Sequence, residues 1–217
     1  MKKVAISSAV FVFFIAVCVF PFTASAQSGG YVGIFGGYTF SPDASWKSGD
    51  FSRDIDIQTT WAVGVKLGYT PPQVRWLSFE LEYNYQNPDI NRTVLDQSGA
   101  NYVAVDGDIK FHSVMYNMTA KYPEGRVHPY LGAGIGASYA DASVKTTSQL
   151  GGTTFIVSDS ETNTAFAWQI LAGLGIDIAN NWTIDIGYRY FATNPKLGHA
   201  EIDYKTSMGT LGLNYRF

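Results

Sequence analysis

The chain has 217 residues and a formal net charge of −3, and only 15% of its residues are charged while 46% are hydrophobic. A typical soluble domain is roughly 25% charged, so the composition argues against an ordinary soluble protein. The acidic balance argues against nucleic acid as a partner, because such binding needs cations that neutralise phosphates. The 14 tyrosines, 14 phenylalanines and 22 glycines favour β-structure.

The first 26 residues have the features of a secretory signal peptide. Two lysines precede an apolar run at residues 4–22, and Ala24 and Ala26 are the small residues that a signal peptidase accepts before its cleavage position. Pro21 and this small-residue pattern argue against the alternative, an uncleaved membrane anchor. We therefore expect an exported protein. The only cysteine lies in the removed segment, so we expect no disulfide in the mature chain.

The remaining sequence, residues 27–217, contains no further apolar run long enough for a transmembrane helix. Instead, apolar and polar residues alternate with the period of two that is typical of half-buried strands. This alternation predicts eight strands, at residues 30–40, 59–70, 75–86, 108–122, 127–140, 163–178, 181–191 and 203–217.

The connections between these strands alternate in length. Tight turns with proline, glycine or asparagine are predicted at 70–73, 123–126 and 179–181. Long polar loops are predicted at the opposite rim, for example at 41–58 and 87–108, and the stretch at 192–202 is shorter. No linker divides the sequence. It therefore predicts a single all-β domain, an eight-stranded antiparallel up-and-down transmembrane β-barrel.

Aromatic residues decide which strand face points outward, because a soluble barrel would turn its apolar face inward. On the apolar face they form two bands separated by aliphatic residues, as at the two interfaces of a lipid bilayer. The band near the long loops contains Tyr38, Phe40, Trp61, Tyr83, Tyr85, Tyr139, Trp168, Tyr188 and Tyr190, and the band near the short turns contains Tyr69, Tyr122, Trp182, Tyr215 and Phe217.

The opposite face carries charged residues in mid-strand, which we expect to line the lumen. This lumen charge cluster consists of Lys66, Glu80, Glu82, Asp185 and Arg189. Folding of the hairpin at 70–73 places Lys66 roughly across from Glu80. The cluster could form a paired plug or line a narrow channel. The small interior of an eight-stranded barrel favours the plug, although glycines on two inner faces, including Gly134 and Gly173, are expected to loosen the packing.

The last strand ends in an alternating pattern of Leu211, Leu213, Tyr215 and the final Phe217. This pattern resembles the C-terminal signal that the barrel-assembly machinery reads in Gram-negative outer-membrane proteins. With the eight strands and the stretch YLGAGIGAS at 130–138, the sequence resembles the outer-membrane β-barrel domain family, which includes the OmpA membrane domain, OmpX and the opacity proteins, small barrels of the porin family. The resemblance implies a location in the outer membrane, with its lipid and the assembly machinery as partners. It implies no single function, because the same scaffold serves several roles.

The three histidines are candidates for catalysis, since some small outer-membrane barrels modify lipid A. The alternation places Ser113 inside and its neighbour His112 outside, so the two cannot form a catalytic pair. His128 precedes a proline at a short turn, and His199 lies in the last loop without a fixed serine. No nucleophile, base and orienting group are brought together, so we expect no enzyme.

No metal-ligand spacing of cysteine or histidine occurs, and we expect no cofactor. Aspartates in the first two loops could hold calcium loosely, but solvated side chains are the simpler interpretation. We expect a monomeric protein with a structural or surface-interaction role, in which the loops contact an unknown extracellular partner. A narrow porin is the alternative, and a lipid A-modifying enzyme comes third.

Overall fold

The computed structural model describes residues 29–48, 51–55, 59–98, 101–150, 153–197 and 200–217. The predicted signal peptide, with Ala24 and Ala26, lies outside these residues. Within the described ranges, no helix is long and apolar enough to cross a lipid bilayer.

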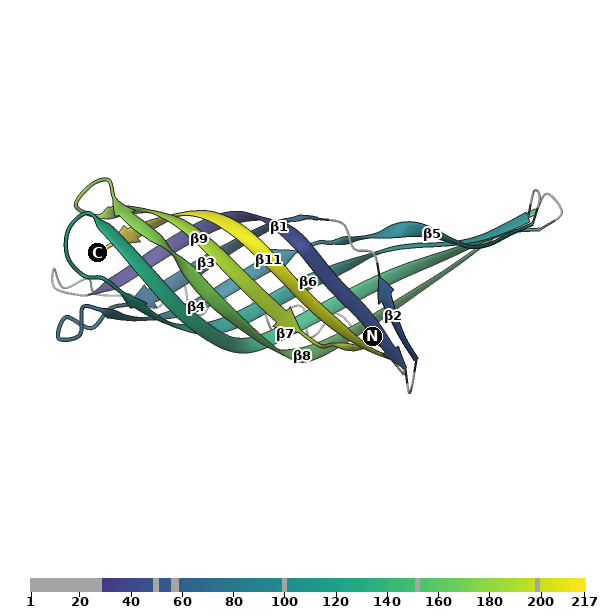
Figure 1. The fold of residues 1–217 in the computed structure, drawn as a ribbon, viewed down its shortest axis with the longest axis horizontal. Coiled ribbons are helices and arrows are strands. Elements are labelled where there is room, and N and C mark those ends of the chain that lie inside the picture. The colour runs from purple at the N-terminus through teal and green to yellow at the C-terminus, as the bar shows by residue number, and fades with distance from the viewer. Residues whose placement is uncertain (1–28, 49–50, 56–58, 99–100, 151–152, 198–199) are drawn as a thin grey trace, which may run out of the picture.

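The described chain forms a closed barrel of eight antiparallel strands, as the sequence predicts (Figure 1). Each strand pairs with the next along the barrel wall, and the last pairs with the first, from Tyr31 opposite Arg216 onward. The barrel strands in spatial order are β1 (Gly30–Ser48), β3 (Trp61–Tyr69), β4 (Leu77–Gln86), β6 (Asn101–Lys121), β7 (Val127–Leu150), β8 (Thr153–Asp177), β9 (Trp182–Thr193) and β11 (Ala200–Arg216).

Several strands are much longer than the sequence predicts, because stretches expected as polar loops continue the strands beyond the barrel. β7 and β8 stay paired up to Leu150 opposite Thr153, and Figure 1 shows them running far beyond the barrel together with β5 and β6. Threonine, valine and serine dominate this extension. The β-propensity of threonine and valine supports a strand even where neither face is apolar enough to show a hydrophobic alternation.

Three short strands complete these extensions: β2 (Phe51–Ile55), β5 (Asp89–Ser98) and β10 (Lys196–Leu197). β2 folds back on the end of β1, and β5 continues the line of β4 along β6 after an interruption at Pro88. β1 itself passes Pro42 through a register shift between Phe40 and Asp43. A proline cannot donate to the ladder, so it interrupts pairing locally, but in both places the strand resumes. The prediction that β1 ends at residue 40 was therefore wrong.

The apolar face points outward over the whole barrel. Ile34, Leu131, Ile135 and Leu211 are each more than half exposed, although they are aliphatic. The predicted aromatic bands flank this aliphatic belt and their members contact one another. Trp61 packs on Tyr85 at one rim with ring centroids 5.8 Å apart, and Trp182 packs on Tyr215 at the other with centroids 4.9 Å apart.

The glycines of the inner face accommodate large side chains from neighbouring strands. A Cβ atom at Gly64 would overlap the ring of Phe35, and one at Gly68 would overlap the ring of Tyr31. Asn117 and Tyr130 likewise occupy the space beside Gly134 and Gly173. At Gly134 and Gly173 the expectation that glycines loosen the lumen was therefore wrong, because amide and aromatic side chains fill the space, whereas Gly175 lines an open cavity at the short-turn end.

Candidate functional site in the barrel lumen

The centre of the lumen is crossed by an ion pair between Glu82 on β4 and Arg189 on β9. These strands lie four positions apart in either direction around the barrel, so the pair spans its full width. The two guanidinium nitrogens Nη1 and Nη2 donate to the two carboxylate oxygens, the second at 3.0 Å. Both residues are buried. A bidentate geometry of this kind is the strongest form of an arginine–carboxylate contact.

Amide side chains form further hydrogen bonds with both members of this pair, whereas the buried Nε atom of Arg189 has no hydrogen-bond partner among the described residues. Asn117 and Asn84 donate to Glu82 at 3.1 and 3.2 Å, and Gln169 accepts from Arg189 at 3.2 Å. Gln169 in turn donates to Asn117 at 2.7 Å. The guanidinium also lies over the ring of Phe35, 4.5 Å from its centroid. Burial of two charges requires such partners, because each unsatisfied position would cost free energy.

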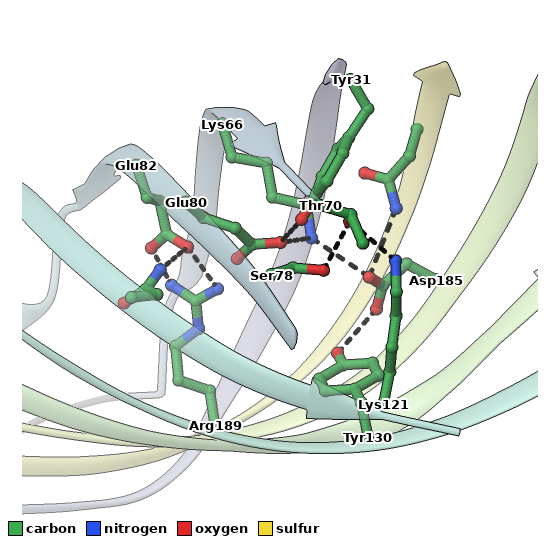
Figure 2. Close-up of polar contacts among 12 residues, drawn as sticks. Tyr31, Lys66, Thr70, Ser78, Glu80, Glu82, Lys121, Tyr130, Asp185 and Arg189 are labelled. Carbon is green, nitrogen blue, oxygen red and sulfur yellow. Dashed lines mark hydrogen bonds and ion pairs between the residues drawn. The ribbon is translucent and has the colours of Figure 1, made fainter. Parts of the chain in front are cut away.

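A second polar group lies closer to the short turns and is centred on Lys66. Its ammonium nitrogen is 3.2 Å from Glu80 and 3.1 Å from Asp185, so one cation joins carboxylates from two strands (Figure 2). Tyr31 donates to Glu80 at 2.5 Å, and Tyr130 donates to Asp185 at 2.8 Å.

The strand register around Lys66 differs from the sequence prediction. Glu82 stands directly opposite Lys66, and Glu80 stands opposite Gly68. The contact between Lys66 and Glu80 is therefore diagonal. Because the long lysine side chain leans along the strand, it reaches a residue two positions from its ladder partner.

An apolar layer fills the lumen on the long-loop side of the Glu82–Arg189 pair. Phe111, Phe191 and Tyr204 pack together there, with the rings of Phe111 and Tyr204 stacked 4.5 Å apart. Met115 and Met208 complete the layer, and all five side chains have no exposed surface. None of these five side chains is therefore in contact with solvent.

The short-turn end of the lumen is hollow. A cavity of about 390 Å³, which we term the vestibule, extends from the turn residues Pro72 and Pro123 inward to Arg189. At its rim Asp177 accepts hydrogen bonds from Arg216 and from Thr183, the latter at 2.7 Å, and lies 3.0 Å from His128. The lumen is thus open at one end and filled at the other.

His112 and Ser113 lie on opposite faces, as the sequence predicts. His112 contacts the Tyr83 hydroxyl at 2.8 Å in the outward aromatic band, whereas Ser113 donates to Ser138 inside the barrel. Among the described residues, no group of three histidine, cysteine or acidic side chains is arranged to hold a metal ion. The side chains of the loop aspartates considered for calcium lie outside the described part.

The residues of the predicted assembly signal all belong to the closing strand or follow it directly. Leu211 and Tyr215 are exposed on the outward face of β11, and Leu213 shares that face. The backbone nitrogen of Phe217 donates to the carbonyl of Gly30 at 3.2 Å, so pairing with β1 continues past the end of β11.

Sequence reasoning missed the neutral side chains of the lumen. Tyr31 and Tyr130 donate hydrogen bonds to the carboxylates around Lys66. Asn117 and Gln169 form hydrogen bonds with the Glu82–Arg189 pair. Their inward alternation was readable from the sequence. Which of them meet across the lumen depends on barrel closure and stagger, which alternation alone does not fix.

The fold and its lumen define a small barrel of the outer-membrane type, with a lipid-facing belt, aromatic girdles and a polar interior. A family model described as "Outer membrane protein beta-barrel domain" matches residues 9–217. The chain therefore belongs to the outer-membrane β-barrel domain family, and this membership implies a location in the outer membrane.

Two solved structures share this fold. Neisserial surface protein A is 19% identical, with a TM-score of 0.51, and the match covers 88% of this chain and 98% of that one. OprG from Pseudomonas aeruginosa is 14% identical, with a TM-score of 0.51, and the match covers 88% and 96% of the two chains.

An uncharacterised protein of Brucella abortus is 38% identical over 72 residues, which are 32% of this chain. The match spans only a quarter of the length of that relative. The two solved structures support the fold, and none of these similarities assigns a specific role.

Proposed function

We propose that the protein is a structural, surface-interacting component of the outer membrane. The barrel anchors the chain in the lipid, and the strand extensions at the long-loop end display a polar surface to a partner outside the cell. In barrels of this class the short turns face the periplasm and the longer connections face outward. Figure 1 shows the extended β5, β6, β7 and β8 reaching far from the barrel on that side.

The observation that supports an anchoring role is the filled cross-section of the lumen. The Glu82–Arg189 pair crosses the barrel, and the fully buried layer of Phe111, Phe191 and Tyr204 lies directly beyond it. An ion crossing at this level would have to displace a hydrogen-bonded charge pair and packed aromatic rings. The lumen charges therefore act as a plug in this proposal.

Closure of the barrel supports a monomer as the assembled form. The ladder between β1 and β11 leaves no unpaired strand edge in the membrane-spanning part of the described chain. Insertion would depend on the barrel-assembly machinery reading the end of β11. No catalytic role is proposed, because His112 and Ser113 act in separate environments.

Single-channel recording tests the anchor against the alternative, a narrow porin. The purified protein is reconstituted into a planar lipid bilayer, and its insertion is verified by protease protection and by the heat-dependent gel mobility of folded barrels. We expect a folded and electrically silent protein. Reproducible conductance steps that change size in an Arg189→Ala variant would contradict the plug and favour the porin.

A further inference from the structure

The vestibule has an unequal balance of charge. Its lining includes five cationic side chains, and the three carboxylates beside them are Glu80, Asp177 and Asp185. Even when Glu82 behind Arg189 is counted, the cations outnumber the carboxylates. A hollow with low-dielectric walls strengthens the field of such an excess charge.

The carboxylates of the vestibule are already engaged by donors of the protein. Glu80 accepts from Tyr31 and pairs with Lys66, and Asp185 accepts from Lys66 and Tyr130. Asp177 is held at the rim by Arg216, His128 and Thr183. They therefore have little capacity left to neutralise a further cation.

Lys121 is a cation of the vestibule that takes part in none of these carboxylate pairings. Its ammonium nitrogen donates to the Thr70 hydroxyl at 3.0 Å and lies 5.9 Å from the ring centroid of Tyr31 (Figure 2). Among the described residues, no carboxylate lies within 4.0 Å of it. An ammonium has three donor hydrogens, so two of them remain for a further acceptor.

Two further cationic donors lie in the same lining. Arg75, on the turn between β3 and β4, is exposed and takes part in none of the ion pairs between described residues. The Nε atom of Arg216 is buried and has no hydrogen-bond partner, although the Nη2 atom binds Asp177. Buried polar atoms without a partner are uncommon in native structures and point to an interaction still to be made.

We propose that the vestibule is a binding site for a small soluble anion that carries a carboxylate or phosphate group. Lys121 binds the anion, and Arg75 and Arg216 contribute further cationic donors from the turn and from the barrel wall. The site opens at the short-turn end, so the ligand comes from the periplasmic side. The volume of about 390 Å³ is within the range of pockets that hold small organic ligands.

A titration followed by nuclear magnetic resonance tests this site. The protein is held in a maltoside detergent, which has no charged headgroup, and inorganic phosphate or acetate is added at constant pH and ionic strength. We expect saturable shifts of the backbone amides around Thr70, Arg75 and Lys121. Lys121→Gln and Arg75→Gln should each weaken binding about tenfold or more, because each removes a charge-assisted hydrogen bond.

Arg126→Gln is the matched control. Arg126 is an exposed arginine at another short turn and is not part of the vestibule lining, so this variant should bind as the wild type does. If Lys121→Gln does not fold, Lys121→Arg keeps the charge and should retain binding, while Arg75→Gln still tests its loss.

Three results would overturn the proposal. The first is the absence of a saturable shift with both probes. The second is unchanged affinity in Lys121→Gln. The third is a response only to added phosphatidylglycerol, which would mean that lipid headgroups rather than soluble anions are recognised.

Discussion

Arg189 and Glu82 bind each other across the full width of the barrel, and their contact joins strands that share no ladder. The two residues lie 107 positions apart in the sequence. Each charge would be costly to bury alone, because removal of one partner leaves the other charge buried without its ion pair. The stability of the lumen should therefore depend on this pair more than on any exposed ion pair.

Glu82→Ala is expected to lower the free energy of unfolding by about 3–5 kcal/mol, because it leaves the Arg189 guanidinium buried without its carboxylate. Urea titration of the barrel in lipid vesicles, followed by tryptophan fluorescence, measures this loss. The double variant Glu82→Leu/Arg189→Met should recover most of it, since no unpaired charge remains. Equal losses in the single and double variants would contradict the role of the unpaired charge.

Glu80→Ala should cost less than Glu82→Ala, about 1–3 kcal/mol. The sequence suggests that this change would leave Lys66 unpaired, but Lys66 also lies 3.1 Å from Asp185 and keeps that partner. The loss then comes from one ion pair and from the Tyr31 hydrogen bond. The same urea titration compares the two variants, and a larger loss for Glu80→Ala would reverse the assigned order.

At the scale of the element, the hairpin of β7 and β8 has two parts: one belongs to the barrel wall and the other extends beyond it. The lower parts of both strands belong to the barrel wall, where β8 pairs with β9 from Ala167 to Asp177. From Phe166 outward the described part of β8 forms ladder pairs only with β7, and the contact with β9 at this point is a side-chain hydrogen bond from Thr193 to the carbonyl of Phe166. Stability should therefore be concentrated in the lower part, where the buried apolar layer also lies.

Replacement of residues 143–160 by an Asn-Gly turn tests this division. Ala142 and Glu161 are ladder partners, so a two-residue turn can close the shortened hairpin. We expect the variant to keep its heat-dependent gel mobility and nearly all of its stability to urea, while binding of cells to an extracellular surface falls. A variant that no longer folds would show that the outer hairpin is part of the cooperative unit of the barrel.

At the scale of the whole molecule, the outward face forms an aliphatic belt between two aromatic girdles. Leu211 is 62% exposed on β11, where its ladder partners are Ile186 on β9 and Gly36 on β1, and Ile34 lies on the same face of β1 as Gly36. Only a hydrocarbon surrounding makes such exposure favourable. The belt therefore fixes the depth at which the barrel sits in the membrane.

Leu211→Arg is expected to destabilise the barrel by about 2–4 kcal/mol in lipid, because it places a charge near the middle of the bilayer. Ser207→Arg is the matched control on the same face of β11. Ser207 lies 2.9 Å from the Tyr188 hydroxyl in the girdle, where the same charge should cost about 1 kcal/mol or less. Urea titration in vesicles measures both, and equal costs would contradict the assigned depth.

The sequence by itself determined the strand number, the inward and outward faces, the aromatic girdles and the charges of the lumen. These features follow from local alternation, because the side chains of a strand point to opposite faces with a period of two. It did not determine how far the strands extend, because polar β-branched stretches carry no hydrophobic alternation even where they pair.

Only the tertiary structure decided which lumen residues meet. Glu82 stands opposite Lys66 in the ladder and yet binds Arg189 across the barrel, while Lys66 binds Glu80 and Asp185. The difference arises from closure, because the stagger of the strands brings β4 and β9 to the same height on opposite walls. The same closure leaves Lys121 beside a hollow and fills the lumen above it with aromatic rings. Local sequence sets the direction of each side chain, and the closed barrel sets its partner.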